Sequence, residues 1–74
     1  MSDKILTSII GAGEHAKHWA QVLQKDLRYK LESVSSRNKD LGLKFAEHNS
    51  CKYFSSTQDI LNDKSINLVI FSSD

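Results

Sequence analysis

Ile9-Ile10-Gly11-Ala12-Gly13-Glu14-His15-Ala16 is the stretch that decides the fold. Residues 4–10, which run into this stretch, are rich in β-branched side chains and are followed by Gly11, which is typical of a buried strand. From Ala16 onward, apolar residues recur at spacings of four, three and four, which predicts one face of a helix that ends near residues 26–29. The apolar residues of this face are Ala16, Ala20, Leu23 and Leu27. The stretch therefore predicts a tight strand-to-helix turn.

This turn fits the pattern G-x-G-x-x-G/A, with Ala16 in the last place. Gly11 permits the tight turn, and Gly13 lacks a Cβ, so that a pyrophosphate can approach the backbone. Free N–H groups at the start of the helix favour phosphate. In this context the pattern predicts a dinucleotide site, and the alternative is a tight turn that binds nothing. The candidate contact residues of the turn are Gly11, Ala12, Gly13, Glu14 and His15.

Strands and helices are predicted to alternate along the rest of the chain. A second strand over residues 29–35 contains Glu32, which must lie near the open end of the strand if this strand is central in the sheet. A helix over residues 40–48 follows, with Asn38 as a candidate cap. The later elements are a strand over 51–54, a short helix from the capping-box residues 56–59 to about 61, and a strand over 66–71. This order predicts an α/β fold over 1–74, a Rossmann-like half domain. Its parallel sheet would have four strands in the order 3-2-1-4, with helices on both faces.

The end of the second strand bears on the choice of dinucleotide. An Asp or Glu about 20 residues past Ala16 would bind the ribose 2′-hydroxyl of NAD. Ser36 and Arg37 stand there instead. Serine can hydrogen-bond a 2′-phosphate and arginine can pair with it, so the sequence predicts NADP rather than NAD. The alternative is that Arg37 is only an exposed loop cation.

Ser72 and Ser73 follow the last predicted strand. Ligands bind at the carboxyl ends of parallel strands, so these serines are candidate cofactor contacts, or else plain polar strand ends. His15 and His18 have a spacing that a metal could use, but no third ligand is evident, so we predict no metal site. Cys51 reads as a small hydrophobic residue that starts a strand.

The composition of the sequence limits the classes of binding partner that can be expected. Ten Lys and Arg against nine Asp and Glu give a net charge of +1, which offers no electrostatic case for nucleic acid or an anionic membrane. The longest apolar run, residues 68–71, is too short to cross a bilayer. The single cysteine excludes an internal disulfide, and we expect a cytoplasmic protein.

The order of these segments resembles the N-terminal region of the Gfo/Idh/MocA oxidoreductases, the glucose-fructose oxidoreductase and inositol dehydrogenase family. The first strand with its phosphate turn and the end of the second strand carry the resemblance, together with residues 45–48, 53–61 and 66–73. The resemblance implies an NAD(P)-dependent oxidoreductase that acts on a sugar or a related polyol or carbonyl compound.

The sequence departs from the family pattern at Asn67, where the family usually has Asp, and at Asp74, where it usually has Pro. The resemblance also implies that the catalytic lysine of a Glu-Lys-Pro motif and the Asp and His pair of a second domain lie beyond the sequence given. We therefore expect the first part of a cofactor domain that alone transfers no hydride. The alternatives are a non-catalytic binding or assembly module or, less favoured, another doubly wound class such as a short-chain dehydrogenase or methyltransferase.

The predicted strand from Ile66 to Phe71 would lie at an edge of the sheet. It is apolar and holds no proline, and such an edge can pair with another chain. We therefore expect a homodimer or a higher oligomer that forms through this edge.

Overall fold

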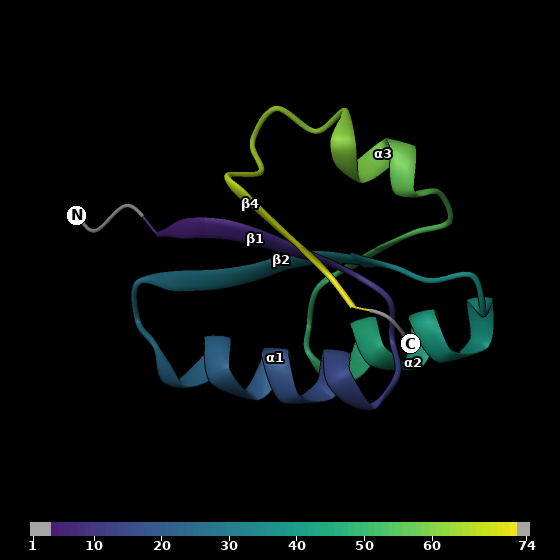
Figure 1. Cartoon of the computed structure of the whole chain (residues 1–74), viewed down its shortest axis with the longest axis horizontal. Helices are drawn as coiled ribbons and strands as arrows, with labels where there is room; N and C mark the ends of the chain where they lie inside the picture. The colour runs from purple at the N-terminus through teal and green to yellow at the C-terminus, as the bar shows by residue number, and fades with distance from the viewer. Residues whose placement is uncertain (1–3, 73–74) are drawn as a thin grey trace.

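The computed structural model describes residues 4–72 and confirms a four-stranded parallel sheet in the order β3-β2-β1-β4. Figure 1 shows the alternation of strands and helices along the chain. The elements are β1 (Ile5–Ile10), α1 (Glu14–Lys25), β2 (Tyr29–Ser35), α2 (Lys39–His48), β3 (Lys52–Phe54), α3 (Thr57–Leu61) and β4 (Leu68–Phe71). No helix within residues 4–72 is long and apolar enough to cross a membrane.

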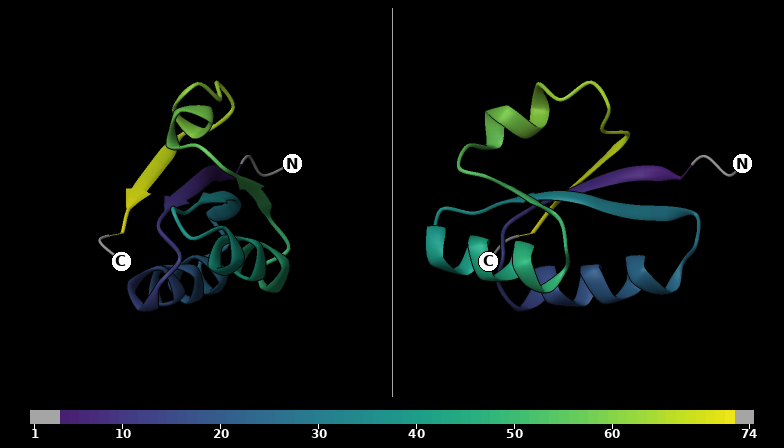
Figure 2. Two further views of the ribbon diagram at one scale, coloured as in Figure 1. Left: turned by 90° about the vertical axis from the view of Figure 1, so that its right-hand side faces the viewer. Right: turned by 180° about the vertical axis from the view of Figure 1, so that it is seen from behind.

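The sheet separates two unequal helical layers. In Figure 1 and in both views of Figure 2, α1 and α2 lie on one face and α3 lies on the other. One row of side chains crosses the sheet, because Ile9 pairs with both Val34 and Ile70 and Val34 pairs with Tyr53. This row packs with Ala16, Ala20, Leu23, Phe45 and Ala46 in the main core.

Small hydroxyl side chains lie in the strands next to this row. Ser8 and Ser33 are fully buried partners in β1 and β2, and their hydroxyls hydrogen-bond to each other. Side chains alternate along a strand, so this pair belongs to the face opposite Ile9 and Val34, which α3 covers. Ile60 of α3 is 1% exposed and is the buried apolar residue of that helix.

Glu32 does not lie near the open end of its strand, so that expectation is wrong. The pairing of β1 with β2 shifts between Thr7 and Ser8, and Glu32 is the extra residue of this bulge. Its carboxylate is 19% exposed and lies 3.6 Å from Lys30 Nζ and 3.5 Å from Lys52 Nζ. Two ammonium groups thus compensate a charge in the middle of the sheet.

The placement of Leu27 and the start of the last strand were also predicted wrongly. Helix α1 ends at Lys25 with Asp26 as its C-cap, within a residue of the predicted end, so Leu27 lies past the helix and is 79% exposed. The last strand begins at Leu68 rather than Ile66. Asn67 precedes it and bonds twice to Leu6, its N–H to the carbonyl at 2.8 Å and its Oδ1 to the N–H at 3.0 Å.

Candidate functional site

The carboxyl ends of three strands bring the predicted site residues to one edge of the sheet. Ile10 pairs with both Ser35 and Phe71, so the residues that follow, Gly11, Ser36 and Ser72, leave the sheet side by side. The Gly11 N–H donates to the Ser35 carbonyl at 2.7 Å, and the Ser72 N–H donates to the Ile10 carbonyl at 2.8 Å. This is the edge at which open parallel sheets bind ligands.

Gly11 is required by the backbone itself. Its φ of +117° lies in the region that glycine readily adopts and other residues rarely do. A Cβ at this position would lie 2.8 Å from the Ser72 carbonyl oxygen and 3.0 Å from Ser72 Cβ. Gly11 therefore lets the end of β4 close against the turn.

The N-terminus of α1 begins at a glycine. Gly13 is the N-cap residue of this helix and has no side chain, so it gives the helix no side-chain cap among the described residues. By contrast, Asn38 caps α2 through Leu41 N–H, and Ser56 caps α3 through Gln58 N–H. Uncapped N–H groups and the helix dipole make this terminus suited to an anion.

The other residues of the turn differ in exposure. Ala12 is buried, at 4% exposed, and belongs to the main core. Glu14 and His15 are exposed in the first turn of α1, and Glu14 lies 3.3 Å from Lys17 Nζ. Both side chains are thus on the surface beside the uncapped terminus.

The hydroxyl of Ser72 is buried at this edge of the sheet. Its Oγ is out of contact with solvent and makes no hydrogen bond within the described part of the chain. A buried polar atom of this kind costs free energy unless a ligand or water satisfies it. Ser73, the other predicted serine, lies outside the described residues.

Ser36 and Arg37 form the turn between β2 and α2. Ser36 Oγ accepts a hydrogen bond from Asn38 N–H at 3.2 Å, so its own hydroxyl hydrogen is left to donate elsewhere. Arg37 is exposed and forms no ion pair with any residue in the range 4–72. One neutral donor and one guanidinium are therefore available side by side at this end of β2.

Sequence reasoning did not foresee how this turn is held. The Tyr53 hydroxyl donates to the Ser36 carbonyl at 3.4 Å, and the Tyr53 ring lies against the backbone of Gly42 in α2. The available signal was a glycine inside a helix, where glycine is unfavourable unless close packing needs it.

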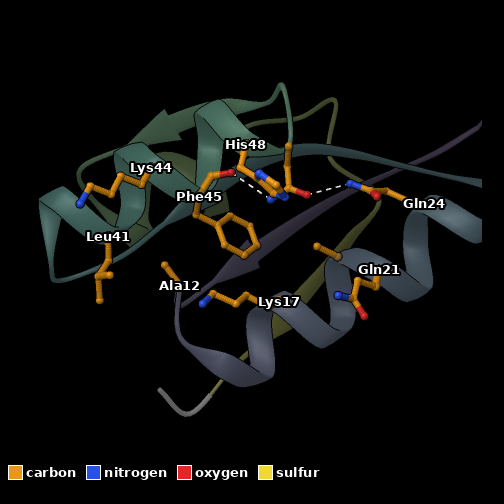
Figure 3. A pocket seen from close by; sticks show the side chains of 10 residues that line it. Ala12, Lys17, Gln21, Gln24, Leu41, Lys44, Phe45 and His48 are labelled. Carbon is orange, nitrogen blue, oxygen red and sulfur yellow. Dashed lines mark hydrogen bonds between the residues drawn. The ribbon is translucent and has the colours of Figure 1, made fainter.

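A groove of about 440 Å³ lies beside this edge, between α1 and α2. Figure 3 shows Lys17, Gln21 and Gln24 on one side of it and Leu41, Lys44, Phe45 and His48 on the other. Ala12 is the candidate site residue that lines it. Leu41 of α2 lies at this groove and is 48% exposed.

Cys51 lies away from this edge, immediately before β3. Burial, with a smaller contribution from the Glu32 carboxylate, raises the pKa of its thiol to about 11. A thiol with a raised pKa carries little thiolate at neutral pH and is a poor nucleophile. This fits its reading as a small hydrophobic residue.

The sequence model of the oxidoreductase family with an NAD-binding Rossmann fold, Gfo/Idh/MocA, matches residues 5–74. Solved structures agree with this match. A protein of Desulfitobacterium hafniense DCB-2 assigned as an NADPH-dependent oxidoreductase is 25% identical, with a TM-score of 0.89 over 97% of this chain and 21% of its own. Biliverdin reductase of Synechocystis sp. PCC 6803, in complex with biliverdin and NADP⁺, is 29% identical, with a TM-score of 0.87 over 93% of this chain and 22% of its own.

GenD2 from gentamicin A biosynthesis, solved with NAD, has the same fold at 22% identity, with a TM-score of 0.91 over 99% of this chain and 21% of its own. The chain thus spans about a fifth of the length of these structures. No curated protein matches the sequence.

Proposed function

The chain belongs to the Gfo/Idh/MocA oxidoreductase family and has its NAD(P)-binding Rossmann fold, and we propose that it binds NADP(H) in preference to NAD(H). The site would comprise the turn residues 11–15, Ser36, Arg37, Ser72 and Ser73. The preference rests on the residues at the end of β2. There Ser36, whose hydroxyl hydrogen can still donate, and Arg37, which forms no ion pair among residues 4–72, stand in place of the usual acid.

The residues at the edge of the sheet fit a dinucleotide in two further respects. The buried Ser72 hydroxyl makes no hydrogen bond among residues 4–72, so a polar group of a ligand could bond to it. Ser72 lies beside Gly11, where the absence of a Cβ leaves room for the end of β4. The uncapped N-terminus of α1 supplies donors for a pyrophosphate close to the same point. NADPH, when bound, would supply a hydride, and this chain's residues would hold the adenosine and pyrophosphate.

For the whole protein we propose reduction or oxidation of a sugar or of a related polyol or carbonyl compound. Family membership supports this substrate class. NADP⁺ in the structure of the 29% identical biliverdin reductase and the NADPH assignment of the 25% identical oxidoreductase support the choice of dinucleotide.

Titration of wild type and Arg37→Ala with NADPH and NADH tests this proposal. We expect wild type to bind NADPH more tightly. Loss of a charge-assisted phosphate contact in Arg37→Ala should weaken NADPH binding by about 1.5–3 kcal/mol and leave NADH binding nearly unchanged. Arg28→Ala is a matched control, since Arg28 is an exposed arginine whose guanidinium already pairs with Asp26 at 2.7 Å. An unchanged NADPH preference in Arg37→Ala would contradict the proposal.

A further inference from the structure

We propose that Tyr53 is a positioning residue for nucleotide selection, and that it fixes the turn between β2 and α2 so that Ser36 and Arg37 can hold a 2′-phosphate. This inference rests on the proposed function, because it concerns the same phosphate. According to this inference, the preference for a 2′-phosphate depends in part on Tyr53, an uncharged side chain on β3.

The Tyr53 ring is seated against helix α2. Tyr53 pairs with Val34 in the row of side chains that faces α1 and α2, so its ring extends toward the α2 backbone. A Cβ on Gly42 would lie 2.3 Å from Tyr53 Cε1, 2.9 Å from Cδ1 and 3.2 Å from Ser36 Cβ. The two distances to the Tyr53 ring are too short for a Cβ and the third is tight, so glycine at this position lets the helix, the ring and the turn meet without displacing the ring.

The Tyr53 hydroxyl ties this packing to the turn. It donates to the Ser36 carbonyl at 3.4 Å. The Ser36 carbonyl and the Arg37 N–H share one rigid peptide plane, so a bond to this oxygen restrains the direction in which Arg37 leaves the turn. Asn38 holds the other side, because its N–H bonds to Ser36 Oγ and its Oδ1 accepts from Leu41 N–H.

Tyr53→Phe separates this role from simple packing, because it keeps the ring and removes only the hydroxyl. The probes are adenosine 2′,5′-bisphosphate and AMP, which differ by the 2′-phosphate alone. We expect Tyr53→Phe to weaken bisphosphate binding by about threefold to tenfold, the range of one hydrogen bond, and to change AMP binding by less than about twofold. Gly42→Ala should narrow the bisphosphate-to-AMP affinity ratio further, because the added Cβ displaces the ring.

Tyr29→Phe is the matched control. Tyr29 lies at the other end of the sheet, opposite Ile5, and the same substitution there should leave the affinity ratio unchanged. Urea unfolding of each variant checks that binding is compared between folded proteins, and Tyr53→Phe carries the test if Gly42→Ala does not fold.

The outcomes separate the two proposals. If wild type prefers the bisphosphate and Tyr53→Phe keeps the same affinity ratio, the positioning role is wrong and the proposed function stands. Equal weakening of both probes would likewise overturn the positioning role, since it would indicate a general structural effect. If wild type shows no preference for the bisphosphate, the proposed function and this inference are both overturned.

Discussion

Gly11 and Gly13 occupy one motif but have different backbone conformations. Gly11 has a φ of +117°, whereas Gly13 has a φ of −89°, which any residue can adopt. The sequence pattern treats both as features of a phosphate-binding turn. The structure shows that Gly11 is also needed for the protein to close the end of β4 against β1.

Alanine substitutions should separate these two roles. Gly11→Ala should lower the free energy of unfolding by about 1–3 kcal/mol, because it combines a strained φ with a contact 2.8 Å from the Ser72 carbonyl. Gly13→Ala should change stability by less than about 0.5 kcal/mol. It should weaken NADPH binding about tenfold, the effect of roughly 1.4 kcal/mol of steric conflict with the pyrophosphate. Urea unfolding and NADPH titration measure the two effects, and a Gly11→Ala protein as stable as wild type would contradict the first.

Among the elements, the local signals predicted most of the fold. The run before Gly11, the cap at Asn38 and the hydroxyl at Ser56 each act over a few residues, and each marked the end or start of an element correctly. The alternation of these elements, together with the glycine-rich turn after the first strand, predicted the sheet order of a Rossmann fold, and the structure confirms it.

The features that were missed depend on contacts between distant segments. Glu32 is placed by a bulge and by Lys52 on a third strand, which no local pattern contains. The hydrogen bond from the Tyr53 hydroxyl to the Ser36 carbonyl joins residues 17 positions apart, and the Tyr53 ring fits there because Gly42 has no Cβ. The sequence indicated which residues gather at the candidate site, but it could not indicate which side chains fix their positions.

The Ser8–Ser33 hydrogen bond offers a test of how β1 and β2 are joined. Both hydroxyls are fully buried and bond to each other, so removing one leaves the other unsatisfied. Ser8→Ala and Ser33→Ala should each lower the free energy of unfolding by about 1–3 kcal/mol. The double variant should lose at least about 0.5 kcal/mol less than the sum. A double-mutant cycle by urea unfolding measures this coupling, with the exposed Ser55→Ala as the control. Strictly additive losses would show that the pair contributes nothing as a unit.

At the scale of the chain as a whole, the two edges of the sheet formed by residues 4–72 differ. β3 has three residues, and its Lys52 ammonium lies 3.5 Å from the Glu32 carboxylate. β4 has the sequence Leu-Val-Ile-Phe without a charge, and its Leu68 and Phe71 side chains are 39% and 68% exposed. Both strands are short, so the charge of the edge makes the difference: a charged edge resists pairing with other chains, whereas an uncharged apolar edge promotes it. We therefore propose that this chain self-associates through β4 rather than β3.

The mass of the protein in solution tests this proposal. Light scattering on the wild-type chain should give at least twice its 8.4 kDa mass at micromolar concentrations. The double variant Leu68→Lys/Phe71→Lys places like charges on both faces of the edge and should shift the protein to monomer. The free energy of unfolding of this monomeric variant should be close to that of a wild-type monomer, since both side chains are already exposed.

Leu27→Lys is the control. It adds a lysine at a leucine that is 79% exposed in the loop between α1 and β2, and it should leave the oligomer intact. A wild-type chain that stays at 8.4 kDa, or an oligomer that Leu27→Lys disrupts as strongly as the β4 variant, would contradict pairing through this edge.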